Sequence, residues 1–221
     1  MEIDIHFMKE QIPLFLDSAL LTLKIACIAI IISLLIASIN GLILFFRIRI
    51  LHKVIRAYVE VARNTPLLIQ LFFLYFGLPS LGIKLSNFSI ALLAMCFLGG
   101  GYMTEVIRSG LDSISKSQVE SGYAIGLNKW QLFRFVILPQ AATISAPALF
   151  ANFIFLLKET SIASAIAVPE LLYTTTNLIS IYYKTSEMLI MLTASYIFLF
   201  VPLSFLLSWL ERRNRYGQFG Y

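Results

Sequence analysis

The sequence predicts an all-α, polytopic membrane protein with five transmembrane helices and its N-terminus outside. Of its 221 residues, 59% are hydrophobic and only 13% are charged, and the mean hydropathy is +0.84. Soluble domains carry about a quarter charged residues, whereas a helix that crosses a bilayer needs about 20 apolar residues. Five such segments use most of the chain, so we expect residues 1–221 to form a single transmembrane domain.

Five apolar segments are long enough to be spans. The first has a polar start around Asp17 that we expect outside the lipid. The second starts around Arg56, Glu60 and Arg63, whose charges we expect in an interfacial first turn at the lipid headgroups. Pro66 is expected to kink or restart the second helix. The N-terminal residues include acids and no basic stretch, so we expect no removable signal peptide. The predicted spans are 15–46, 57–79, 87–107, 137–158 and 187–209, with a polar coupling loop at 112–135.

The basic residues predict the orientation of these spans, because Lys and Arg gather on the cytoplasmic side. Twelve lie on the side of the C-terminus and four on the other side, which puts the N-terminus outside and the C-terminus inside. The net charge of +5 reflects this orientation, and no soluble basic face indicates nucleic-acid binding. The twelve are Arg47, Arg49, Lys53, Arg56, Arg63, Arg108, Lys116, Lys129, Arg134, Arg212, Arg213 and Arg215; the four are Lys9, Lys84, Lys158 and Lys184.

The longest polar connection runs from Asp112 to Phe135. It cannot cross lipid, and its apolar residues recur at loosely helical spacing, which predicts a short amphipathic helix. Gly126 can adopt a positive φ and turn the chain between two short helices, and Pro139 suits the first turn of the next helix. From these residues alone, an ordinary interfacial helix and a docking element for a cytoplasmic partner are equally supported.

Ionisable groups inside spans usually mark a pathway or a pair. Glu105 and Arg108 are three residues apart and predict an ion pair along one helix. His6 and His52 have no carboxylate or cysteine partner at ligand spacing, so we expect no metal site. The chain has no GxxxxGK[ST] sequence, so any nucleotide has to be bound by another polypeptide.

Lys158-Glu159-Thr160-Ser161, late in the fourth span, is the strongest candidate for contact with a solute. Lys158 and Glu159 can hold the carboxylate and the ammonium group of a zwitterion; equally, they can form a salt bridge or gate between paired subunits. Asn152 lies two helical turns before Glu159 and would suit a polar or uncharged solute side chain.

The loop and its surroundings resemble a known family. Glu120-Ser121-Gly122, Gly126, Val136 and Leu138-Pro139 have the spacing of the EAA loop, which marks the membrane subunits of ATP-binding-cassette importers. Small or isosteric residues replace the usual ones, since Ser121-Gly122 stands for two alanines and Val136 for isoleucine.

Further segments, in order from residue 20 to about 165, are similar to the histidine, glutamine and arginine permeases, which take up polar amino acids. The departures are Ser117 and Gly101, where glycine and alanine are usual. The matching segments are Leu21-Thr22-Leu23, Tyr58-Val59-Glu60, Arg63 to Gln70, Tyr75 to Pro79, Tyr102 with Glu105 and Arg108, Ser117 to Glu120, Pro139-Gln140-Ala141 and Lys158 to Ser161.

The resemblance implies a type I importer permease of MetI-like architecture in the bacterial inner membrane, with no catalysis and no cofactor of its own. Its implied partners are two cytoplasmic ATP-binding subunits that use the ATP, a second permease subunit of the same or a related chain, an extracytoplasmic solute-binding protein and a polar amino acid. The expected ATPase-coupling residues are Glu120, Ser121, Gly122, Gly126 and Pro139. The expected solute pathway includes Tyr102, Asn152, Lys158, Glu159, Thr160 and Ser161.

Two other function classes remain as alternatives. A secondary transporter of small polar solutes usually shows an internal inverted repeat, and no self-similarity is visible here. A non-transporting membrane scaffold or enzyme needs neither a pathway nor an ATPase partner. Uptake driven by an ion gradient without ATP would favour the first, and purification without any ATPase would favour the second.

Overall fold

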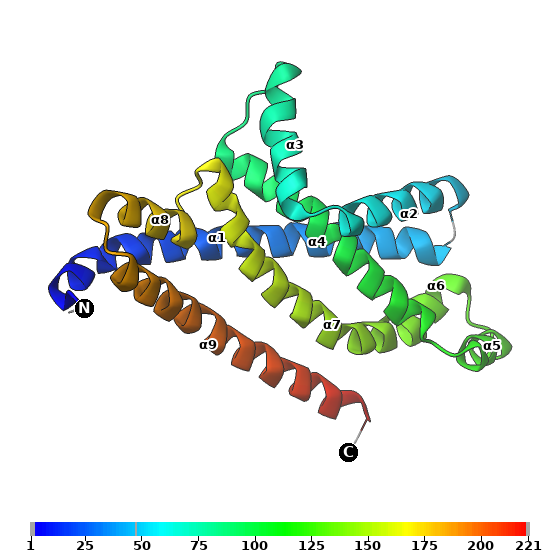
Figure 1. Cartoon of the computed structure of the whole chain (residues 1–221). Coiled ribbons are helices and arrows are strands. Elements are labelled where there is room, and N and C mark those ends of the chain that lie inside the picture. Colours follow the sequence, from blue (N-terminus) through cyan, green and yellow to red (C-terminus); the bar gives the residue numbers. More distant parts are fainter. Residues whose placement is uncertain (1–2, 47, 220–221) are drawn as a thin grey trace. The chain divides into compact units, whose positions relative to one another are not determined.

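The computed structural model of the chain describes residues 3–46 and 48–219, with side chains up to residue 210, and every element in this part is helical (Figure 1). This confirms the predicted all-α fold class. Of the basic residues that predict the orientation, Arg47 lies outside the described residues, as do the side chains of Arg212, Arg213 and Arg215.

Among the described residues, four helical segments are long and apolar enough to cross a membrane. They are α1 (Ile5–Phe46), α4 (Asn87–Asp112), the stretch Lys129–Ile166, and residues Thr185–Leu210 of α9 (Thr185–Phe219). The helix α1 begins at Ile5 rather than near residue 15. Its 42 residues measure about 63 Å at 1.5 Å per residue, so it is longer than the about 30 Å of hydrocarbon.

A fifth span is counted only if α2 (Arg49–Asn64) and α3 (Leu67–Ser80) are taken together. The break lies at Thr65–Pro66, where proline has no N–H to donate and disfavours a helical conformation at the preceding residue. The predicted span 57–79 therefore consists of the end of α2 and all of α3. The two helices differ in character, because α2 carries charges on one face whereas α3 is almost wholly apolar.

The stretch Lys129–Ile166 contains four consecutive helical elements. They are α6 (Lys129–Leu132), a π-helical turn (Phe133–Ile137), α7 (Leu138–Glu159) and a 3₁₀ helix (Thr160–Ile166). The short α5 (Lys116–Ala124) precedes this stretch, and α8 (Leu171–Tyr182) follows it.

The chain divides into two compact units, and each contains segments from distant parts of the sequence. The first unit comprises Met1–Ile31, Thr65–Cys96 and Ile154–Leu206; the second comprises Ile32–Asn64, Phe97–Phe153 and Leu207–Tyr221.

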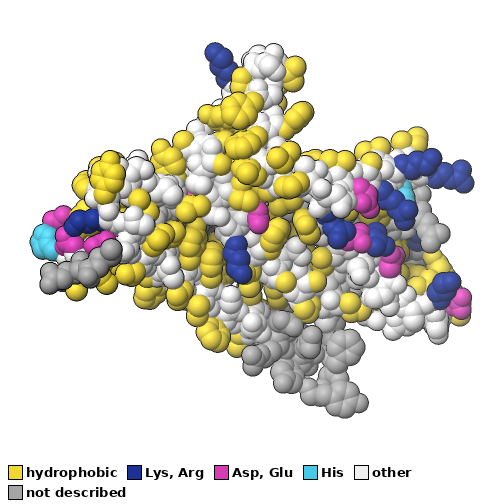
Figure 2. Space-filling model, in the orientation of Figure 1, with side chains coloured by type: hydrophobic (Ala, Val, Ile, Leu, Met, Phe, Trp, Pro, Cys, Tyr) yellow, Lys and Arg dark blue, Asp and Glu magenta, His cyan; other side chains and the backbone are white. Residues whose placement is uncertain are grey.

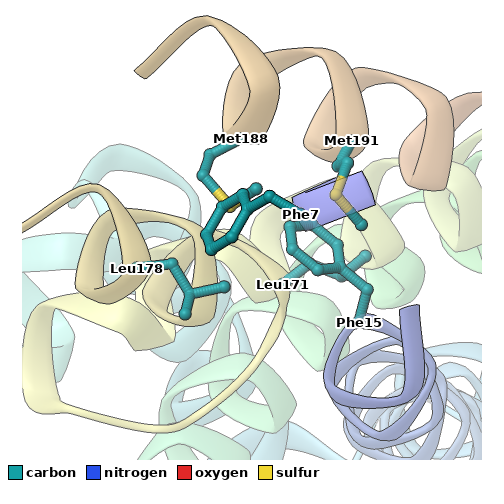
Figure 3. Packing of buried hydrophobic residues seen from close by; sticks show 6 residues of the cluster. All are labelled: Phe7, Phe15, Leu171, Leu178, Met188 and Met191. Carbon is teal, nitrogen blue, oxygen red and sulfur yellow. The ribbon is translucent and has the colours of Figure 1, made fainter. Parts of the chain in front are cut away.

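The core of the first unit joins the start of α1 to α8 and α9, as Figure 3 shows. Aromatic rings from α1 meet aliphatic and thioether side chains from the other two helices, and Met188 and Leu171 are fully buried. Burying side chains of this size contributes about 1.5–3 kcal/mol each. The cluster consists of Phe7, Phe15, Leu171, Leu178, Met188 and Met191.

Buried polar contacts fix α8 against α1 within this unit. The hydroxyl oxygens of Ser18 and Thr174 lie 2.6 Å apart. Glu170 caps α8, where its carboxylate accepts hydrogen bonds from the backbone N–H groups of Leu172 and Tyr173. Burial raises the pKa of the Glu170 carboxyl to about 7, and the two backbone hydrogen bonds act in the opposite direction.

In the second unit, α2 packs through one face and exposes the other. Ile55 and Val59 are buried and cluster with Leu44 of α1, while the Tyr58 hydroxyl donates a 2.8 Å hydrogen bond to the Phe97 carbonyl of α4. The exposed face of α2 is basic, and Figure 2 shows dark blue and magenta side chains gathered over α2 and the C-terminal part of α4.

Candidate functional site

The polar loop between α4 and α7 is shaped by local signals in its own sequence. The Ser115 side chain accepts a hydrogen bond from the backbone N–H of Gln118 and caps α5. Gly126 has φ +86, so the predicted positive-φ turn between two short helices is confirmed. Asn128 and Gln131 then form a reciprocal capping box that begins α6.

A close contact between α5 and α6 holds the loop together. Gly122 is buried, and a Cβ atom on it would lie 2.4 Å from Cδ1 of Leu132, so the two helices approach through a residue without a side chain. Leu132 packs with Phe133 and Ile137 in a cluster that also receives Val119 of α5. The loop therefore has a hydrophobic interior of its own.

The opposite face of α5 is open. Glu120 and Ser121 are exposed, and neither contributes to the cluster beneath the helix. Of the five predicted coupling residues, these two lie where another molecule can contact them, whereas Gly122 and Gly126 shape the loop. The structure thus divides the set into an exposed pair and a supporting pair.

One connection between the loop and α7 was not assigned from the sequence. The side-chain amide of Gln118 in α5 donates a 3.0 Å hydrogen bond to the side-chain oxygen of Gln140 in α7. Gln140 in turn donates to the Val136 carbonyl, which fixes its side chain. The two glutamines are 22 residues apart, so no local periodicity brings them together; only their place in two matching family segments pointed to them.

Pro139 lies in the first turn of α7, as predicted. This turn is not a free helix end, because the helical stretch begins at Lys129 and runs through the π-helical turn Phe133–Ile137 into α7. A proline inside a helix removes one N–H donor and crowds the carbonyl four residues earlier. The wider π-helical turn directly before Pro139 relieves this crowding, and such turns are frequent at functional sites.

An ion network runs along the last turns of α4. Glu105 and Arg108 form the predicted pair, with 2.9 Å between Arg108 Nε and Glu105 Oε2. Arg108 also contacts Asp112, and an Arg63 nitrogen of α2 lies 3.9 Å from Glu105. The Arg63 guanidinium lies 5.4 Å from the ring centroid of Tyr102, so this predicted pathway residue stands beside a cation.

The remaining predicted pathway residues lie on α7 and the 3₁₀ helix after it. The hydroxyls of Thr160 and Ser161 donate to the carbonyls of Leu157 and Lys158, so both serve the helix end. Lys158 is exposed and Glu159 is half-buried beside apolar side chains that include Leu71 and Met95. Among the described residues, no ion pair joins Lys158 to Glu159 or to any other side chain.

Asn152 belongs to the second unit, whereas Glu159 belongs to the first. The side-chain amide N–H of Asn152 donates a 2.8 Å hydrogen bond to the Ala148 carbonyl of its own helix, so its side-chain oxygen is the group that remains for other contacts. Among the described residues, no group of three or more His, Cys, Asp or Glu side chains is arranged to hold a metal ion.

A chain with several helices long and apolar enough to cross a membrane, joined in part by a polar loop of short capped helices, is a polytopic membrane protein. The family model for the binding-protein-dependent transport system inner membrane component matches residues 29–216, and the chain belongs to this family. It is accordingly a membrane-spanning permease subunit of the inner membrane, which confirms the predicted family and location.

Individual relatives agree with this assignment. The chain is 38% identical over 167 residues to the probable glutamine ABC transporter permease protein GlnP of Bacillus subtilis (strain 168), covering 76% of this chain and 77% of that one. It is 32% identical over 217 residues to the glutamine transport system permease protein GlnP of Escherichia coli (strain K12), covering 97% and 99%.

Solved structures share the fold. A solved structure of an amino acid ABC transporter with histidines matches with a TM-score of 0.90 and 33% identity, and the match covers 96% of this chain and all of that one. An inward facing structure of the MetNI methionine ABC transporter matches with a TM-score of 0.78 and covers 93% and 98%. At 18% identity the second likeness concerns the fold alone, and it agrees with the predicted MetI-like architecture.

Proposed function

We propose that this chain forms the solute pathway of an ATP-driven importer for a polar amino acid, with its N-terminus outside and the α5–α6 loop in the cytoplasm. The names of its relatives, which refer to glutamine and other amino acids, support this solute class. The excess of Lys and Arg on the side of the loop supports the orientation.

The observation that carries the proposal is the division of α5 into two faces. Gly122 packs against Leu132 and anchors the helix, whereas Glu120 and Ser121 remain exposed. A helix that is anchored through one face and exposed on the other can transmit a movement of a bound cytoplasmic partner to the rest of the chain. Through the Gln118–Gln140 hydrogen bond the movement would reach α7.

The partners follow from this role. The chain itself acts as a lever and a pathway wall without catalysis or a cofactor, while two cytoplasmic ATP-binding subunits hydrolyse ATP. A second permease subunit, the same chain or a relative, completes the pathway, and an extracytoplasmic protein delivers the solute.

Lys158 and Glu159 either hold the two charged ends of the amino acid or form a gate between the paired permeases. In the part of the chain that the structure describes, no ion pair joins the two side chains, which is compatible with either role.

Reversal of charge at Glu120 tests the coupling role. Glu120→Lys should abolish solute-stimulated ATP hydrolysis and uptake in proteoliposomes, because the exposed carboxylate would no longer pair with a basic residue of the ATPase. Lys116→Glu shows whether the effect is specific to position 120, since Lys116 is also exposed, lies one helical turn earlier on the same face, and has its charge reversed as well. Wild-type uptake by Glu120→Lys would refute the coupling role, and uptake that follows an ion gradient without ATP would favour a secondary transporter.

A further inference from the structure

A large cavity lies in the second unit, apart from the coupling and pathway residues. Its volume is about 1260 Å³, and it is an open cavity lined by the C-terminal ends of α1 and α4 together with α2, α5 and the start of α6. None of the residues assigned above to coupling or to the pathway lines it. The cavity therefore needs an explanation of its own.

Its lining is strongly basic, with one acidic side chain, Asp112, against five basic ones. Two of the five already have partners in the described structure: Arg108 is paired with Glu105 and Asp112, and the Lys129 ammonium lies 5.0 Å from the Phe46 ring centroid. The five basic side chains are Arg49, Lys53, Arg56, Arg108 and Lys129.

Arg49, Lys53 and Arg56 remain, and all three are exposed residues of α2. Their i, i+4, i+7 spacing places them on one face of the helix. Within the described residues, none of the three takes part in an ion pair. Arg56 also interacts at longer range with the Glu105 carboxylate, whereas Arg49 and Lys53 carry the row's other two positive charges. A row of three cations provides a binding surface for an anion.

The same wall of the cavity is also apolar. Ile50 and Val54 of α2 line it and are 79% and 59% exposed. Aliphatic side chains this exposed are unfavourable in water but not next to acyl chains. A helix with a basic row beside exposed aliphatic residues is typical of elements that lie at a membrane surface. Its neighbours in sequence are the apolar helices α1 and α3.

We propose that this cavity binds the headgroup of an anionic phospholipid, with the phosphate among Arg49, Lys53 and Arg56 and the acyl chains along Ile50 and Val54. Basic pockets next to transmembrane helices on the cytoplasmic side are suited to such headgroups. A soluble anion would use the charges but leave the aliphatic wall exposed. Tyr123 of α5 also lines the cavity, so its hydroxyl can donate to the phosphate.

Native mass spectrometry of the detergent-purified full chain tests the proposal with dioleoyl phosphatidylglycerol and dioleoyl phosphatidylcholine as probes. The wild type should retain phosphatidylglycerol in preference. Each cation near an anionic lipid strengthens binding about fivefold, so the double variant Arg49→Gln, Lys53→Gln should bind it about 25-fold more weakly. The double variant Lys9→Gln, Lys84→Gln is the control; it loses the same charge at exposed positions outside the cavity and should bind as the wild type does.

Several outcomes would overturn the proposal. Equal loss in both double variants would mean that net charge alone attracts the lipid. Displacement of the lipid by millimolar inorganic phosphate would mean that a soluble anion is the ligand. Unchanged lipid binding with loss of a copurifying ATPase would make the cavity a protein contact. If the neutral variant does not fold, a photoactivatable phosphatidylglycerol on the wild type still decides, because its cross-links must fall on residues that line the cavity.

Discussion

Replacement of Gly126 by alanine isolates the cost of a single backbone conformation. Gly126 has φ +86, and no atom lies within 4 Å of a Cβ built on it, so the new methyl group meets no obstacle. The only penalty is the left-handed conformation, which costs an L-residue about 1–2 kcal/mol. The opening equilibrium of the α5–α6 turn should therefore increase about 5- to 30-fold.

Hydrogen exchange of the turn amides measures this equilibrium. The Gly126 N–H donates to the Tyr123 carbonyl at 2.9 Å, and the Leu127 N–H donates to the Gly122 carbonyl at 3.1 Å, so both amides should exchange faster in Gly126→Ala. Amides of α8, which belongs to the other unit, should be unaffected. In an importer the loosened loop should also transmit less force, so uptake per ATP hydrolysed should fall.

Two variants serve as controls for this reasoning. Asparagine adopts positive φ more readily than alanine, so Gly126→Asn should exchange more slowly than Gly126→Ala. Gly77 lies in α3, also with nothing within 4 Å of an added Cβ but without a positive φ, so Gly77→Ala should stabilise its helix by up to about 1 kcal/mol. Exchange in Gly126→Ala equal to that of the wild type would show that the turn conformation does not hold the loop.

Two further predictions concern ionisable groups. Between the ordinary pKa of 4.5 and about 7 the folded chain keeps a proton on Glu170 that the unfolded chain has released. The free energy of unfolding should therefore fall by about 3 kcal/mol as the pH rises through this window. In thermal unfolding between pH 5 and pH 8, Glu170→Gln should flatten this pH dependence. Lys158→Ala and Glu159→Ala should each reduce uptake about tenfold or more if they bind the charged ends of the solute; loss of the paired permease on purification, with solute binding intact, would instead support the gate.

Local signals in the sequence were sufficient to predict features that depend on a single helix or turn. The pair Glu105–Arg108 follows from helical spacing, and the turn at Gly126 follows from the freedom of glycine in a polar loop. The break at Pro66 follows from the missing N–H of proline. The apolar stretches located the long helices. The helix α1 also extends to Ile5, before the predicted span 15–46, because polar residues can extend a helix beyond its apolar part.

Contacts between elements were not accessible from the sequence. The hydrogen bond from Gln118 to Gln140 depends on how α5 packs against α6 and the π-helical turn, and the cavity beside α2 depends on where α1 ends. The continuity before Pro139 was not accessible for a related reason. Pro139 does lie in the first turn of α7, but the capping box at Asn128 had already begun the helical stretch, and a π-helical turn leads into α7.

This arrangement constrains how a force on α5 can be transmitted. The loop is stiff, because a buried glycine contact and two capped helices hold it against Leu132. The first weaker point along the chain is the π-helical turn Phe133–Ile137, where the regular hydrogen-bond pattern changes and Pro139 provides no donor. A bend at this turn would change the angle between α6 and α7. The Gln118–Gln140 hydrogen bond spans this turn from α5 to α7, so a bend at the turn would strain or break it.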